Sequence, residues 1–173
     1  MYFGLVIAST IFVADQASKY IIIEWIMRPE GVTVTPFFST VVVEVFPILN
    51  LRMAWNSGIS FSLFDWNNVL VTIFLIGVQI GITSWLVWWL GKLRDNWLRA
   101  AVGLIIGGAC GNILDRMRYG AVADFVDVHI AGFHWPTFNL ADAAICIGVI
   151  MWLIDAFILQ TQHTNDKTIM KDG

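Results

Sequence analysis

Three carboxylates in the last third of the sequence, Asp124, Asp127 and Asp142, could support acid–base chemistry. Asp142 is predicted in the first turn or two of an apolar helix, where the helix dipole favours an anion. Asp124 and Asp127 lie in the connection before this helix, and a folded connection can bring one of them to Asp142. Two carboxyls that meet in a dry site cannot both ionise easily, so one keeps its proton while the other can draw a proton from water. The spacing predicts such a pair, but it does not choose between Asp124 and Asp127.

The other catalytic signatures of hydrolases are weak in this sequence. His129 and His134 lie five residues apart in a predicted loop, and without an H-E-x-x-H motif they are a poor metal signal. Ser57 and Ser60 flank Gly58, but no G-x-S-x-G motif marks a nucleophile. We therefore expect neither a metal nor a cofactor.

The elements that must position these groups are predicted to cross a membrane. Of the 173 residues, 58% are hydrophobic and 13% charged, and the mean hydropathy is +0.73, which is too apolar for a soluble domain. Four apolar stretches have the length of a bilayer-spanning helix, about residues 2–23, 69–90, 98–114 and 137–159. The net charge of −3 and the lack of a basic run argue against nucleic-acid binding. We predict one α-helical membrane domain over residues 1–173, a four-transmembrane-helix bundle.

The short connection 91–97 sets the predicted orientation of the bundle. It is the densest basic segment and follows Trp85, Trp88 and Trp89, which form an aromatic belt typical of a membrane interface. By the positive-inside rule, this connection, the tail 160–173 and both termini are expected in the cytoplasm.

The two longer connections, 24–68 and 115–136, are then expected on the extracytoplasmic side. Each contains a run rich in β-branched and aromatic residues, 32–50 in the first and 122–130 in the second. These runs predict a small extracytoplasmic β-rich subdomain in which the two could pair.

Small residues repeat every four positions within the predicted spans, which allows helix backbones to approach closely. The repeats are Gly77 and Gly81; Gly103, Gly107 and Gly111; and Ala144 and Gly148. Gly108, Asn112 and Arg116 form a parallel stripe on the third span. A tightly packed third helix is therefore expected to bring Asn112 and Arg116 to one place at the outer interface.

Charged residues within spans are costly, and they are candidates for function as well as for structural ion pairs. Asp15 and Lys19 lie one helical turn apart in the first span, and Asp115 and Arg116 close the third. One alternative function is a small polytopic transporter or proton channel with these four residues as a relay, although the inner halves of the last two spans are almost wholly apolar. A non-catalytic assembly subunit would explain the glycines, but it leaves the acidic residues without a role.

Four stretches, taken in order and spacing, resemble the lipoprotein signal peptidase family, also called signal peptidase II. They are residues 15–19 (DQASK), 56–61 (NSGISF), 107–116 (GGACGNILDR) continuing to Gly120, Val122, Asp124 and Phe125, and 138–142 (FNLAD). The third stretch is highly specific, and the resemblance covers essentially the whole chain. Ser60 is a departure, since the family pattern usually has Ala there, and it would alter the shape of the pocket rather than the chemistry.

The resemblance implies an intramembrane aspartyl endopeptidase with Asp124 and Asp142 as the catalytic pair. It also implies a substrate-binding set that holds the substrate, lines its pocket or borders the site. This set is Asp15, Lys19, Asn56, Gly58, Phe61, Asn112, Arg116 and Asn139. Asp127 is then a supporting or merely exposed acid.

The substrate that the resemblance implies is a bacterial prolipoprotein whose lipobox Cys carries a diacylglyceryl group, and cleavage is expected just before that Cys. The implied partners are prolipoproteins and membrane lipids, and the implied location is the bacterial cytoplasmic (inner) membrane. We expect the protein itself to be a monomer. The lipid chains would hold the scissile bond at the outer membrane surface, where the predicted topology also puts Asp124 and Asp142.

Overall fold

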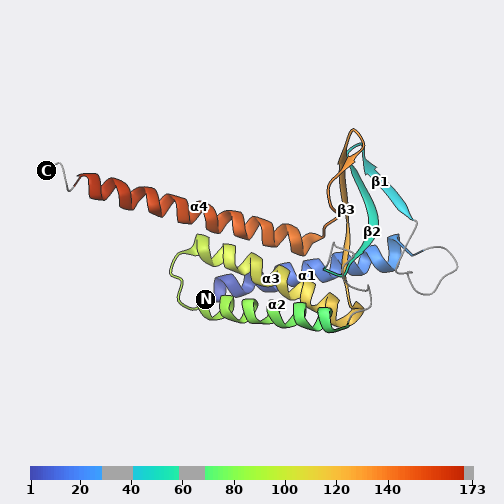
Figure 1. Ribbon diagram of the computed structural model, residues 1–173, viewed down its shortest axis with the longest axis horizontal. Coiled ribbons are helices and arrows are strands. Elements are labelled where there is room, and N and C mark those ends of the chain that lie inside the picture. The colour runs from blue at the N-terminus through green and yellow to red at the C-terminus, as the bar shows by residue number, and fades with distance from the viewer. Residues whose placement is uncertain (29–40, 59–68, 170–173) are drawn as a thin grey trace.

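Four long helices form the body of the protein. The computed structural model describes residues 1–28, 41–58 and 69–169, and the side chains of these ranges as far as Phe157. The helices are α1 (Tyr2–Ile21), which continues into a π-helical turn η1 (Ile22–Ile26), α2 (Val69–Leu90), α3 (Asn96–Tyr119) and α4 (Leu140–Ile169). They run alongside one another, and the N-terminus lies at the same end of the bundle as the α2–α3 connection (Figure 1). Each contains a stretch long and apolar enough to cross a membrane.

The predicted four-transmembrane-helix bundle is confirmed, with differences at the helix ends. The second predicted span, 69–90, coincides with α2. Helix α3 extends beyond 98–114 in both directions, because Asp95 caps its start by accepting the Trp97 amide at 2.6 Å and Gly120 ends it in the left-handed conformation, φ +75°. Helix α4 begins at Leu140 rather than near residue 137, because Asn139 caps it there.

Helix α3 contacts each of the other three helices, and glycines allow this close packing. A side chain at Gly103 or Gly107 would meet the backbone of α1 at 2.5 Å, and one at Gly148 would meet the backbone of α3 at 2.6 Å. The prediction of close helix packing is confirmed at these positions. It is wrong for Gly77 and Gly81 of α2, where no described atom lies within 4 Å of a side-chain position.

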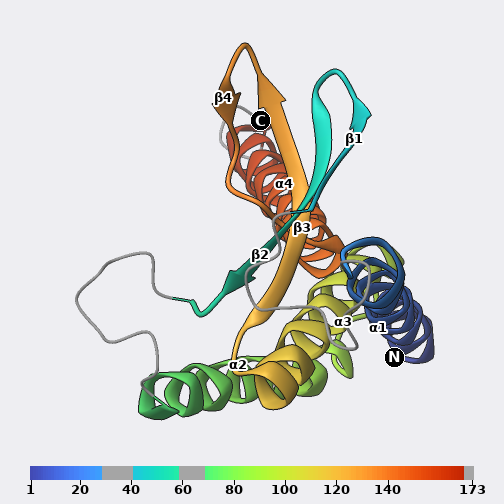
Figure 2. The same cartoon turned by 90° about the vertical axis from the view of Figure 1, so that its right-hand side faces the viewer.

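A four-stranded antiparallel sheet stands at one end of the bundle (Figures 1 and 2). In spatial order its strands are β1 (Val42–Phe46), β2 (Leu49–Asn56), β3 (Val122–Ile130) and β4 (Phe133–His134). The predicted run 122–130 is strand β3. The other run, 32–50, contains β1 but ends early in β2, and its residues 32–40 lie outside the described part of the chain. The predicted pairing is confirmed, since Leu49 faces Val128 and β2 continues along β3 to Asn56.

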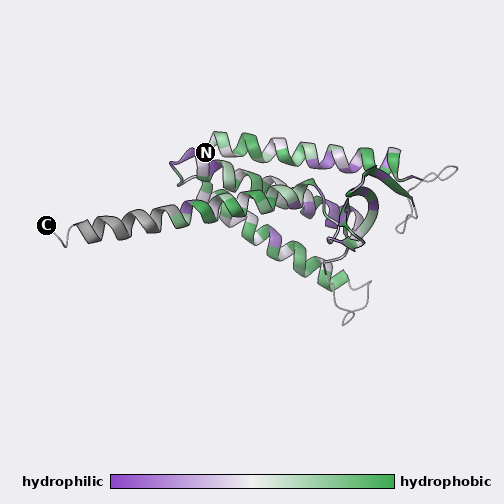
Figure 3. Cartoon of the chain, turned by 90° about the horizontal axis from the view of Figure 1, so that it is seen from above, coloured by the Kyte–Doolittle hydropathy of each residue, from purple (hydrophilic) through white to green (hydrophobic). Residues whose placement is uncertain are grey.

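An apolar cluster fastens the sheet to the end of α1. Its buried members come from η1, from the turn that follows, and from β2 and β3: Ile22, Ile23, Met27, Met53, Ala123 and Phe125. Hydrophilic residues gather where the helices meet the sheet (Figure 3). The fold therefore brings polar groups of α1, α3 and α4 under the strands.

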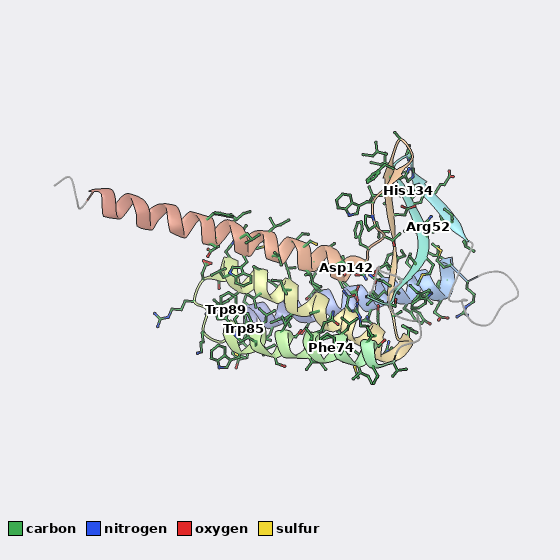
Figure 4. All side chains as sticks on the ribbon, in the orientation of Figure 1. Arg52, Phe74, Trp85, Trp89, His134 and Asp142 are labelled. Carbon is green, nitrogen blue, oxygen red and sulfur yellow. The ribbon has the colours of Figure 1, made fainter. Side chains whose placement is uncertain are left out.

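The opposite end of the bundle carries a tryptophan cluster. The rings of Trp85 and Trp89 stack with their centroids 5.6 Å apart, and the ring of Trp152 lies 5.0 Å from that of Trp89. Lys92 Nζ lies 3.5 Å from the centre of the Trp88 ring. Figure 4 places Trp85 and Trp89 at the end of the helices away from Asp142. The two ends of the bundle thus differ strongly in chemistry.

Candidate active site

Asp124 of β3 and Asp142 of α4 meet where the sheet joins the bundle. Asp124 is buried and Asp142 half-buried, and Figure 4 shows Asp142 at the start of α4 beside the sheet. Burial, the charge of Asp142 and a hydrogen bond between the two carboxyls together raise the pKa of Asp124 to about 7, although hydrogen bonds from Asn56 and Asn139 act the other way. The pair can therefore hold a proton at a pH where an ordinary aspartate is ionised.

A capping box orients Asp142. Asn139 precedes the first residue of α4, and its Oδ1 accepts the amide of Asp142 at 2.9 Å. In return, Asp142 Oδ2 accepts the amide of Asn139 at 3.3 Å. The N-x-x-D sequence over residues 139–142 supplies this reciprocal pair of bonds. The carboxylate of Asp142 is thus fixed by the same bonds that begin the helix.

Three asparagine amides hold the two carboxyls from different segments. Asn139 Nδ2 donates to Asp124 Oδ1 at 2.7 Å, and Asn56 Nδ2 at the end of β2 donates to Asp124 Oδ2 at 3.0 Å. Asn112 Nδ2 of α3 donates to Asp142 Oδ1 at 2.8 Å. The side chain of Asn112 also accepts a bond from Asn139 Nδ2 at 3.3 Å. Four elements therefore converge on one pair of acids.

Asp127 has a different neighbour. It is buried, and both of its carboxylate oxygens lie close to His134 Nδ1, at 2.8 and 3.0 Å. The ring of His129 stacks on His134 with centroids 5.0 Å apart. Residues 124 and 127 are three apart on β3, so their side chains leave opposite faces of the strand. The geometry thus joins Asp124, not Asp127, to Asp142, and the expectation of a merely exposed Asp127 is wrong.

Arg116 lies on the same stripe of α3 as Asn112, as predicted. Its Nη1 donates to Gln79 Oε1 of α2 at 3.3 Å and to the Asn112 carbonyl at 3.4 Å. Its buried Nε finds no hydrogen-bond partner among the described residues. The positive charge of Arg116 interacts electrostatically with both Asp124 and Asp142. The guanidinium therefore offers a free donor beside the acid pair.

The backbone just after β2 lies close to Asn56 and Arg116. The amide of Gly58 donates to Asn56 Oδ1 at 2.8 Å, and Gly58 has φ +88°. A side chain at Gly58 would meet the end of the Leu75 side chain at 2.6 Å and lie in ordinary contact with Arg116 Nη2 at 3.5 Å. The positive φ is therefore the main reason why glycine is needed here. Phe61 and Ser60 lie outside the described residues.

A cavity of about 440 Å³ opens beside Asp124. One wall comes from β2 and the other from the segment before α4, and its lining is Arg52, Ala54, Trp55, Asn56, Asp124, His134, Trp135, Pro136 and Thr137. Figure 4 shows Arg52 and His134 on the sheet above Asp142. Among the described residues, no group of three or more His, Cys, Asp or Glu side chains comes together as metal ligands would.

Asp15 and Lys19 lie behind the acid pair rather than beside the cavity. Both are almost fully buried, and each contacts protein groups of α1, α3 or α4. Sequence reasoning did not single out Gln16 and Gln79 of this region, and it named Asp115 only as a candidate for an ion pair or a charge relay. Gln79 carried a usable signal, because an amide in the middle of an otherwise apolar span calls for a polar partner.

The chain is similar to signal peptidases along almost its whole length. The family model described as Signal peptidase (SPase) II matches residues 7–158. A lipoprotein signal peptidase of Janthinobacterium sp. (strain Marseille) is 39% identical over 153 residues, 86% of this chain and 84% of the relative. Those of Vibrio vulnificus (strain CMCP6) and Nitrobacter hamburgensis are 36% and 39% identical, covering 87% and 90% of this chain and 86% and 92% of theirs.

The fold is also similar to a solved bacterial membrane enzyme, determined by the in meso method at 2.3 Å resolution. The two chains are 30% identical and superpose with a TM-score of 0.72 over 94% of this chain and 92% of the other.

Proposed function

Because this chain belongs to the signal peptidase II family, we propose that it is the membrane peptidase that removes the signal peptide from diacylglyceryl-modified prolipoproteins. Cleavage falls just before the lipidated Cys of the lipobox. The observation that carries the proposal is the contact between Asp124 and Asp142 beside a cavity at the end of four apolar helices. A substrate anchored by lipid would present its scissile bond at such a boundary.

In the proposed mechanism the two carboxyls have different roles. Asp124 keeps a proton because burial and Asp142 raise its pKa to about 7, so Asp124 is the acid. Asp142, half-buried and fixed by the capping box, is the base that takes a proton from water. The water oxygen bonds to the peptide carbon while Asp124 donates its proton to the carbonyl oxygen, giving a gem-diol.

Collapse of the gem-diol returns both carboxyls to their starting states. A hydroxyl of the diol gives its proton back to Asp124, and Asp142 passes its proton to the amide nitrogen as the C–N bond breaks. The products are the carboxyl end of the signal peptide and a free amine on the lipidated Cys. One water is consumed per cleavage, and both carboxyls are regenerated.

The residues around the acids suit peptide binding. The buried Nε of Arg116, which lacks a partner among the described residues, supports a role in binding a substrate carbonyl. Asn112 and Asn139 orient the acids, and Asn56 and Gly58 line the entrance. The family resemblance implies a substrate-binding role for Phe61 as well. We assign Asp15 and Lys19 to holding the site rather than to touching the substrate, because both are buried behind it.

We propose that the sheet lies on the extracytoplasmic surface of the bacterial inner membrane, with both termini in the cytoplasm. Support comes from the tryptophans and Lys92 at the opposite end, which fit a cytoplasmic interface. We also propose that the chain is one membrane domain in contact with lipid and acts as a monomer, because one chain supplies both acids. The relay alternative is less well supported, since Asp15, Lys19 and Asp115 bond to one another at one end of the bundle.

The test uses purified protein in detergent with two precursors that differ only at the lipobox Cys. One carries the diacylglyceryl group and the other does not. We expect release of the signal peptide, measured by mass spectrometry, from the lipidated precursor alone. Equal cleavage of both precursors would contradict the proposed substrate, and cleavage of neither by folded protein would contradict the proposed activity.

A further inference from the structure

A closed cluster of charges lies behind the acid pair. Asp15 and Lys19 of α1 and Asp115 of α3 are 0%, 3% and 1% exposed. Lys19 Nζ lies 2.8 Å from Asp15 Oδ2 and 2.7 Å from Asp115 Oδ2, and it donates to Asn112 Oδ1 at 3.2 Å. The ammonium therefore has one acceptor for each of its three N–H groups. It has no donor left for a substrate.

Each acid of the cluster also holds one backbone amide from another element. Asp15 Oδ1 accepts the amide of Ala141 at 3.0 Å, and Asp115 Oδ2 accepts the amide of Ala123 at 3.2 Å. Ala141 is the residue before Asp142, and Ala123 is the residue before Asp124. The cluster is therefore hydrogen-bonded to the backbone amide of the residue that precedes each member of the acid pair.

Gln16 closes the cluster between the two buried acids. Its Nε2 lies 3.1 Å from Asp15 Oδ2 and 3.0 Å from Asp115 Oδ1. Residues of two neighbouring helices, α1 and α3, thus link the start of β3 to the start of α4 through buried charges.

We propose that Asp15, Lys19 and Asp115 are positioning residues that set the separation and mutual orientation of Asp124 and Asp142. The proposal rests on the proposed catalytic role of that pair. Burying three charges is costly and contributes little net stability compared with an apolar cluster, whereas a catalytic group misplaced by about 1 Å can lose about 10²-fold in rate. Because the cluster holds the amides of Ala123 and Ala141, beside the two paired acids, the cost of burying its three charges is tolerated at this point of the fold.

Two pairs of variants test the proposal. In Asp115→Ala the amide of Ala123 loses its acceptor, while Asp115→Asn keeps an oxygen that can accept it. In Gly111→Ala every charge is retained, but the new methyl group collides with the Asp15 carboxylate. Gly81→Ala is its matched control, because no described atom lies near that position on α2. Val102→Ala, in the buried core at the far end of α3, is a control for loss of stability alone.

We expect Asp115→Ala and Gly111→Ala to lower kcat about 10²-fold while KM for the lipidated precursor stays within threefold. Asp115→Asn recovers part of the rate. Gly81→Ala and Val102→Ala keep the wild-type kcat, although Val102→Ala lowers the unfolding temperature. The proposal is overturned if Asp115→Ala and Gly111→Ala keep wild-type kcat, or if loss of kcat simply follows unfolding temperature across the set.

A second readout needs no substrate, so it separates this proposal from the proposed function. The groups that face Asp124 are Asp142 of α4, Arg116 of α3, Asn56 of β2 and Asn139 before α4. When the two carboxyls move apart, Asp124 loses the influence of Asp142 that raises its pKa. A carboxyl titration by ¹³C NMR should show Asp124 titrating at lower pH in Asp115→Ala and Gly111→Ala than in wild type and Gly81→Ala. An unchanged titration overturns the positioning role, whether or not the protein cleaves the precursor.

Discussion

At the scale of single residues, the two paired acids give the sharpest prediction. Asp124→Asn and Asp142→Asn should each lower kcat by about 10²- to 10⁴-fold, because each removes one partner of the proton exchange. The double variant should be little worse than either single one, since the pair acts as a unit. Cleavage of the lipidated precursor in single-turnover assays measures this loss.

Asp127→Asn is the matched control for these variants. It is the same substitution on the same strand at an equally buried position, and Asn can still accept a bond from His134. Its kcat should stay close to wild type. A large loss in Asp127→Asn together with activity in Asp124→Asn would exchange the roles of the two acids.

The pKa of Asp124 predicts the shape of the pH profile. Because the carboxyl holds its proton up to about pH 7, the pair lacks an acid above that pH, and kcat/KM should fall about tenfold per pH unit. The Asn56 hydrogen bond stabilises the ionised carboxylate. Asn56→Ala should therefore raise the pKa and move this decline to higher pH. The control Asn50→Ala, on the same strand, should leave the pH of the decline in kcat/KM unchanged. A decline that moved to lower pH in Asn56→Ala would refute the reasoning.

Residue types and spacing predicted an acid pair and the placement of Asn112, but not which of two acids on β3 takes part. The roles of Asn56 and Asn139 were implied by the family resemblance. That choice depends on which face of β3 turns toward α4, and the face is set by pairing with β2 over a sequence separation of about seventy residues. Asp15 and Lys19 were recognised as important, yet their burial behind the pair depends on how α1, α3 and α4 pack together. Neither the orientation of β3 nor the burial of Asp15 and Lys19 can be predicted from a short motif, because both depend on contacts between distant parts of the chain.

At the scale of elements, glycines on two helices should respond differently to the same substitution. Gly107→Ala places a methyl group 2.5 Å from the Ala8 carbonyl of α1 and should destabilise the bundle by about 1 to 3 kcal/mol, since backbone atoms cannot move aside easily. Gly77→Ala meets no described atom and should be neutral or stabilising by up to about 1 kcal/mol, because Ala favours helix. Unfolding in mixed detergent measures both, and equal effects would contradict the packing argument.

The helices were easier to predict than the strands for a physical reason. An apolar span carries its signal in every residue, so α2 was predicted to the residue. Helix α3 was predicted to end at Leu114 because Asp115 and Arg116 look like the start of a loop, whereas their partners on other elements let the helix continue. Strand β2 is defined by its pairing with its neighbours β1 and β3, and its sequence alone gives little indication of where it ends.

At the scale of the whole molecule, the two unlike ends of the bundle predict its orientation. A fluorescent protein fused after Gly173 should fold and fluoresce, because the positive-inside rule puts that end in the cytoplasm. Alkaline phosphatase fused at the same point should be inactive, and the same enzyme inserted in the β3–β4 turn at Gly132 should be active. The reverse pattern would place the acid pair on the cytoplasmic face, where a lipid-anchored precursor exported across the membrane could not reach it.

Asn139 has two duties, since it begins α4 and also bridges Asp142 to Asp124. Because Asn139 and Ala141 at this helix start are fully buried, that first turn should open only when the sheet separates from the bundle. On warming, cleavage of the precursor should therefore be lost together with the contacts between sheet and helices, so thermal inactivation reports on this junction rather than on the apolar lengths of the spans.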